Sequence, residues 1–261
     1  MGRKTIDRVG EENYNNFGSK MIIINYRKCK DIDVCFPKYN WMAKNVRYDH
    51  FKDGKIKCPY EKRYYNKGYL GEGKYKILEN GKLTKCYKTW NHMLQRCFDE
   101  KCQIKRPTYK GCTVCDEWLN FQVFAEWYYK NYYEIEGEIM HLDKDILVKG
   151  NKIYSAENCI FIPERINTLF TKCDKARGKY PIGVSHYKQH NKYSSNCHVY
   201  NFKENKSKQI HLGYYNTPEE AFKVYKQFKE SYIKQIADLY KDKIPKKLYD
   251  TMYNYEVEIT D

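Results

Sequence analysis

Two segments near the N-terminus have the pattern of β-strands. Residues 20–26 (KMIIINY) form a short apolar run, and residues 31–36 (DIDVCF) alternate polar with apolar side chains. A period of two buries one side of a strand and leaves the other in water, and several glycines then mark turns. Residues 1–83 therefore predict a small β-rich module.

The middle of the chain has the period of amphipathic helices. Apolar side chains recur every three or four residues in 86–98 (CYKTWNHMLQRCF) and again in 116–132 (DEWLNFQVFAEWYYKNY). This spacing gathers them on one face of each helix. The second segment opens with two acids, which suit a helix N-terminus. We expect both aromatic faces to form a core.

The next segment predicts two strands and a helix. MHLDKDIL and YSAENCIFIP have the length and composition of short strands, with a turn at 149–151 between them. Pro163 then starts a helix, PERINTLF, where a missing N–H costs nothing. Along the first strand, residues two apart face the same side. We therefore expect one face of this strand to hold three polar side chains: His141, Asp143 and Asp145.

The C-terminal part predicts a three-stranded sheet packed on one helix. The runs IGVSHYK, KYSSNCHVYNF and KQIHLGYY are strand-like, and Thr217-Pro-Glu-Glu220 forms a capping box with proline at the first helical position. Five apolar side chains then recur at helical spacing and are expected to pack on the sheet: Ala221, Phe222, Tyr225, Phe228 and Tyr232.

The charge of the chain indicates a polyanionic partner. Lys and Arg number 48 against 33 Asp and Glu, a net charge of +15. Residues 1–83 carry +9, residues 84–172 carry +1 and the remainder carries +5. Two basic parts thus flank a neutral one, an arrangement suited to gripping phosphates around a centre rich in carboxylates. No apolar run approaches a membrane span or a signal peptide, so we expect a cytoplasmic protein that does not bind membranes.

The eleven cysteines favour reduced thiols over a disulfide framework, because their number is odd and they are scattered. One close pair, Cys112 and Cys115, has the spacing of half a zinc site. A Zn²⁺ site is therefore the second interpretation, with four candidate ligands: Cys97, Cys102, Cys112 and Cys115.

The strand–turn–strand–helix segment resembles the HNH nuclease motif of phage homing endonucleases. The similarity covers residues 86–172; ENCIFIP is similar to the second strand of the motif, and Asn167 occupies its last position. The resemblance implies a ββα fold, a divalent ion such as Mg²⁺ and a general base that activates water. It implies Asp143 and Asp145 as metal ligands, and Asn158 and Asn167 as groups that orient the strand, the water or the metal.

The position of the general base stays open between two registers. If LDKDI is aligned with the motif, Asp143 matches the metal-binding acid and Lys144 takes the place of the catalytic histidine. If His141-Leu142-Asp143 is aligned instead, His141 is the base, but Met140 stands where an acid is usual. His141 is the first candidate because Lys144 faces the opposite side of the predicted strand.

The C-terminal segment resembles the DNA-binding domain of the ethylene-response-factor (ERF) type. Gly183-Val184, HLGYY at 211–215 and TPEEA at 217–221 match its motif over about residues 180–230. The resemblance implies a sheet that lies in the major groove. Lysines replace the usual arginines here, which favours phosphate binding over base discrimination. The candidate DNA-binding residues are Lys188, Lys192, Tyr193, Lys208, His211 and Tyr214.

Together these patterns predict a multidomain α+β protein. Its expected parts are a β-rich module (1–83), an HNH-like domain (84–172), an ERF-type domain (178–240) and a tail (241–261). The first hypothesis is a metal-dependent endonuclease of the phage homing type, which acts on double-stranded DNA in a bacterial host cell. The alternative is a catalytically inactive, sequence-specific DNA-binding or regulatory protein. Binding of RNA by the aromatic-rich parts is a third hypothesis.

Overall fold

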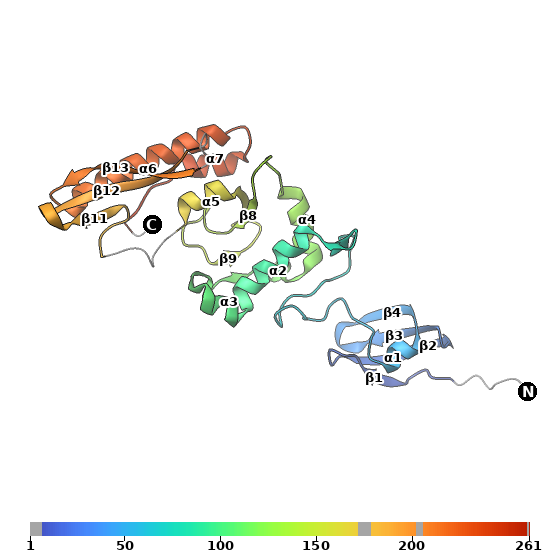
Figure 1. Cartoon of the computed structure of the whole chain (residues 1–261). Helices are drawn as coiled ribbons and strands as arrows, with labels where there is room; N and C mark the ends of the chain where they lie inside the picture. The colour runs from blue at the N-terminus through green and yellow to red at the C-terminus, as the bar shows by residue number, and fades with distance from the viewer. Residues whose placement is uncertain (1–6, 172–178, 202–205, 260) are drawn as a thin grey trace, which may run out of the picture. The chain divides into compact units, whose positions relative to one another are not determined.

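The chain combines helices with several small sheets, as predicted for an α+β protein (Figure 1). The computed structural model describes residues 7–171, 179–201, 206–259 and 261. Among these residues, no helix is both long enough and apolar enough to cross a membrane.

Contacts divide the chain into two compact units. The first comprises Met1–Asn131 and Lys152–Ala156, and the second comprises Tyr132–Asn151 and Glu157–Asp261. The division passes through residues 84–172, which the sequence predicts as one domain. The part of that segment up to Asn131 belongs to the first unit, whereas its antiparallel strand pair and the short helix that follows belong to the second.

The first unit begins with an antiparallel sheet in the order β1–β2–β3–β4. Its strands are β1 (Glu12–Tyr14), β2 (Lys20–Lys28), β3 (Asp31–Phe36) and β4 (Trp41–Val46). A 3-10 turn, η1 (Pro37–Tyr39), joins the last two. Alternate side chains of β2 and β3 are buried and pack with Phe51 of α1 (Tyr48–Lys52). The two strands predicted here are therefore confirmed.

The remaining first unit contains three α-helices. They are α2 (Lys85–Phe98), α3 (Glu100–Lys105) and α4 (Phe121–Asn131), with the 3-10 turns η2 (Pro107–Tyr109) and η3 (Asp116–Leu119). Two short strand pairs accompany them: β5 (Leu78–Glu79) with β6 (Lys82–Leu83), and β7 (Thr113–Val114) with β9 (Ile153–Tyr154).

The predicted helix 86–98 is confirmed, whereas the predicted helix 116–132 is broken in two. Asn120 is extended, and its Oδ1 accepts the N–H of Gln122 at 2.9 Å, which starts α4 as a separate helix. The aromatic faces form a core, as expected. The indole of Trp90 donates to the carbonyl of Trp118 at 2.7 Å, and both side chains are almost fully buried.

The second unit contains the C-terminal sheet, in the order β11–β12–β13, and the two helices beside it. The elements are β11 (Val184–Tyr187), η4 (Lys188–His190), β12 (Lys192–Asn201), β13 (Lys206–Tyr215), α6 (Pro218–Tyr240) and α7 (Lys246–Tyr253). The predicted capping box is confirmed, because Thr217 and Glu220 bond each other's backbone N–H groups. Three strands and a helix therefore form where the sequence predicts them.

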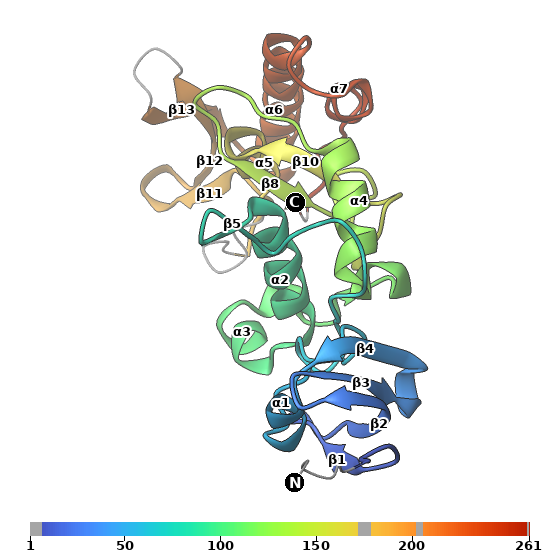
Figure 2. The ribbon, with the colours of Figure 1, turned by 90° about the vertical axis from the view of Figure 1, so that its right-hand side faces the viewer.

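One core joins the C-terminal sheet to both helices. Cys197 of β12 packs in the same apolar cluster as Tyr225 and Ile233 of α6. Figure 2 shows α6 and α7 next to each other, and Leu248 and Met252 of α7 are fully buried in that cluster. The segment expected to be a tail is thus partly a packed helix.

Candidate functional site

Two strands and a helix of the second unit carry or flank the predicted catalytic residues. β8 (Met140–Asp143) pairs antiparallel with β10 (Ile160–Pro163), and α5 (Glu164–Phe170) follows directly. Glu138, just before β8, accepts a hydrogen bond from Tyr240 of α6 and pairs with Arg165 of α5 at 3.2 Å. These contacts fix α5 and the strand pair to α6.

The first strand is shorter than predicted, and Asp143 is the reason. Its Oδ1 accepts the backbone N–H groups of Asp145 at 2.9 Å and Ile146 at 2.7 Å. Backbone groups bonded to a side chain cannot continue a β-ladder. β8 therefore ends at Asp143, and the expected alternation from His141 through Asp145 along one strand is wrong for Asp145.

The surroundings of Asp143 disfavour the ionised form of its side chain. Burial and then the negative charge of Asp145 raise the pKa of Asp143, although two backbone N–H groups oppose the rise. One carboxylate oxygen carries both backbone bonds. The two acids predicted as metal ligands thus lie close enough to interact.

Lys144 is buried, with 6% of its surface exposed. Its Nζ lies 3.2 Å from Oδ2 of Asp145, whose side chain is about half exposed. A buried ammonium group requires such a partner. Lys144 therefore neutralises part of the negative charge of Asp143 and Asp145, which we call the acidic pair.

His141 lies on β8, opposite Ile162 of β10. It alternates with the buried Leu142, so it shares a side of the strand with Asp143, as predicted. Its Nε2 is 3.8 Å from Oε1 of Glu164, the first residue of α5. The sequence does not single out Glu164, but an acid next to a proline at a helix start is a visible signal.

The asparagines are arranged around the loop that follows β8. Asn158 donates to Oδ1 of Asn151 at 3.4 Å, and Asn151 donates to the carbonyl of Lys144 at 2.6 Å. Asn158 therefore acts on the loop through Asn151, which the sequence places only in a turn. Asn167 is half-buried on α5, and the structure gives its side chain no hydrogen bond among the described residues.

The described residues contain no group of three or more His, Cys, Asp or Glu side chains that could hold a metal ion. Of the four candidate zinc ligands, Cys97 and Cys112 are buried, and Cys102 and Cys115 are half-buried. They do not form a tetrahedral set. Any metal at the acidic pair would need ligands from water or substrate.

The side of the C-terminal sheet that faces away from α6 carries a polar cluster. Ser194 and Asn196 lie two residues apart on β12, opposite Tyr214 and His211 of β13. The Nδ1 of His211 is 3.1 Å from Oδ1 of Asn196 and 3.3 Å from Oγ of Ser194. The rings of His211 and Tyr214 are 4.5 Å apart. We call these four residues the outer-face cluster.

The predicted DNA-binding residues divide between the two sides of the sheet. His211 and Tyr214 belong to the outer-face cluster, and the exposed Lys192 begins the same alternation on β12. Tyr193 and Lys208 point to the opposite side, since Lys208 pairs with Val199 of the core beside α6.

Three further polar residues belong to this sheet or to the turn within it. Lys188 is exposed in η4, the turn that leads from β11 to β12. Ser194 and Asn196 were missed from the sequence, although their spacing of two on a predicted strand was a usable signal.

Comparison of the chain with protein-family models, with curated proteins and with solved structures gives no match. No relative therefore transfers an activity to this chain.

Proposed function

We propose that the protein is a DNA endonuclease that hydrolyses phosphodiester bonds with the help of a divalent metal ion. The observation that carries this proposal is the acidic pair, Asp143 and Asp145, at the end of β8. This strand pairs with β10, and α5 follows β10 directly. Two interacting carboxylates, one of them with a raised pKa, form a site where a cation is favourable.

The acidic pair fits Mg²⁺ better than Zn²⁺. Mg²⁺ commonly takes one or two carboxylates from a protein and completes its six ligands with waters and substrate phosphates. Asp143 keeps one oxygen outside its backbone hydrogen bonds, and Asp145 is half exposed. Such an ion would stabilise the negative charge on the leaving oxygen of a phosphodiester.

His141 is the proposed general base. It shares a side of β8 with Asp143, so a water near the metal-binding side would lie within its reach. Glu164 would orient the ring and stabilise the imidazolium formed when the ring accepts a proton. Asn158 would hold the loop through Asn151, and Asn167 would contact the DNA strand or a water.

The C-terminal sheet is the proposed DNA-binding surface. The outer-face cluster offers amide, hydroxyl and imidazole groups, which can bond base edges, and Lys188 and Lys192 add charge for phosphates. The net charge of +15 supports the same partner, because phosphate neutralisation releases counterions.

A second candidate is a DNA-binding protein without nuclease activity. The specific observation in its favour is the ion pair between Lys144 and Asp145, since an ammonium group can supply the charge that a metal would otherwise bring. In that case the strand pair and α5 are only structural, and the C-terminal sheet retains its function.

Two measurements on the full-length protein separate the candidates. One is the conversion of supercoiled DNA to nicked or linear forms with Mg²⁺, Mn²⁺ or a chelator, and the other is binding of a labelled duplex at several salt concentrations. Metal-dependent cleavage supports the first candidate. Tight, salt-sensitive binding without cleavage on phage and bacterial DNA supports the second. Loss of cleavage in His141→Ala but not in Lys144→Met identifies His141 as the base.

A further inference from the structure

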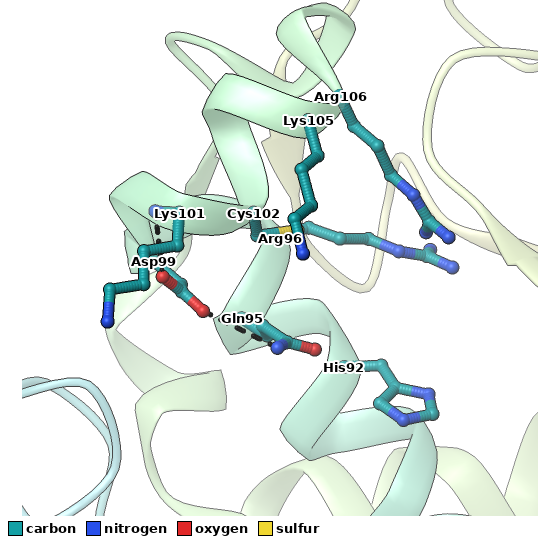
Figure 3. A pocket seen from close by; sticks show the side chains of 8 residues that line it. All are labelled: His92, Gln95, Arg96, Asp99, Lys101, Cys102, Lys105 and Arg106. Carbon is teal, nitrogen blue, oxygen red and sulfur yellow. Dashed lines mark hydrogen bonds between the residues drawn. The ribbon is translucent and has the colours of Figure 1, made fainter.

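A pocket of about 480 Å³ lies between α2 and α3, wholly within the first unit (Figure 3). The polar face of α2 provides one wall, because His92, Gln95 and Arg96 recur at helical spacing and Asp99 follows one turn later. Helix α3 and the residue after it provide the other. Their lining side chains include Lys101, Lys105 and Arg106.

The pocket has an excess of positive charge. Four cationic side chains line it, against the single carboxylate of Asp99. That carboxylate is already engaged, because it accepts the N–H of Lys101 at 2.9 Å and a weak bond from Gln95 at 3.4 Å. Among the described residues, none of the four cations forms an ion pair. The excess charge is therefore available to a ligand.

Arg96 is held in position without being neutralised. Its guanidinium lies 5.2 Å from the centre of the Tyr109 ring, and the side chain of Tyr154 is a second neighbour. Both partners are uncharged phenols, and Arg96 itself is half-buried. A fixed and partly desolvated guanidinium loses little entropy when it binds an anion.

Arg106 lines the same part of the pocket as Arg96. Burial and then the positive charges of Arg96 and Arg106 lower the pKa of His92, so both guanidinium groups lie near the imidazole. In Figure 3 the ends of these two arginines point toward the side of the pocket where the His92 ring lies, whereas Lys101 extends the other way. Two planar groups with several donors each thus converge on one region.

We propose that this pocket binds the phosphate group of a nucleotide, either in a polynucleotide backbone or in a free nucleotide. Guanidinium groups bond phosphate oxygens in pairs, which gives both strength and geometry. A volume of about 480 Å³ also accommodates a nucleoside monophosphate. The polynucleotide source rests on the proposed function, whereas the free-nucleotide source does not.

The test uses His92 as a reporter in the full-length protein. Its ring signals are assigned in NMR spectra by comparison with His92→Gln and followed during titration with AMP and, separately, with a short DNA duplex at constant salt. Arg106→Gln is the test variant, because Arg106 is exposed and its replacement leaves the core intact. Arg47→Gln is the control, because it removes the same charge from an exposed arginine outside the pocket.

We expect the His92 signals to shift with at least one ligand, and Arg106→Gln to weaken that binding about tenfold while Arg47→Gln leaves it unchanged. A shift with DNA alone identifies a backbone phosphate, and a shift with AMP alone identifies a free nucleotide. No shift with either ligand, or equal affinities in the two variants, overturns the proposal. Unchanged tryptophan fluorescence shows that the variants are folded. The AMP titration tests phosphate binding in the pocket even if the protein neither binds nor cuts DNA.

Discussion

Replacing Gly183 by alanine should destabilise the C-terminal sheet for two separable reasons. Gly183 precedes β11 and has a φ of +76°, which an L-residue adopts only at a cost of about 1 kcal/mol. A Cβ there would also lie 2.1 Å from Cδ2 of the buried Tyr225 ring. Displacing a packed aromatic ring adds about 1–3 kcal/mol. We therefore expect a total loss of about 2–4 kcal/mol.

Gly150→Ala is the matched control, because Gly150 has a φ of +78° but no atom within 4 Å of the place that a Cβ would occupy. It should lose only the backbone cost. The four tryptophans all lie in the first 131 residues, so hydrogen exchange of β12 and α6 peptides is the suitable assay. Equal loss of protection in the two variants would refute the close approach of Gly183 to Tyr225.

Three smaller predictions concern a cap, the thiols and an ion pair. Thr217→Ala should reduce the stability of α6 by about 1 kcal/mol, measured as faster hydrogen exchange in its first turn; an unchanged rate would contradict the capping role. At pH 8 iodoacetamide should alkylate the exposed Cys29 quickly, and Cys86 only after unfolding, because burial raises the pKa of Cys86 to about 12; mass spectrometry of peptides checks this. The Arg27 guanidinium holds the pKa of Asp33 well below its usual range, so this acid stabilises the fold above about pH 4 and the contribution is lost as the pH falls further. Asp33→Asn should therefore show a weaker loss of stability on acidification than the unmodified protein, followed by tryptophan fluorescence in urea.

The elements that follow from local pattern are the ones that the sequence predicts well. In the strands around Ser194, successive side chains alternate between the two sides of the sheet. The helix after Thr217 has both a capping box and a regular apolar face, so local and tertiary preferences agree in these elements. The helix that begins near Cys86 is confirmed for the same reason.

The differences arise where a polar side chain or a distant segment decides the structure. Asp143 ends its strand by bonding two backbone N–H groups, and Asn120 splits a helix in the same manner. Residues Ile153–Tyr154 pair in parallel with Thr113–Val114, a long-range choice that no local period encodes. The basic pocket depends on the chain turn at Asp99, which brings α3 beside the polar face of α2.

The central claim is that the carboxylate of Asp143 supports metal-dependent cleavage of DNA. Its most direct test compares the nicking rate of supercoiled DNA by Asp143→Asn and by Asp242→Asn in Mg²⁺. Both variants lose one carboxylate from the second unit, but Asp242 is exposed after α6 and outside the strand pair. We predict at least a hundredfold slower nicking by Asp143→Asn, in keeping with the loss of about 3 kcal/mol of transition-state stabilisation, and an unchanged rate for Asp242→Asn. Equal rates in the two variants would contradict the account.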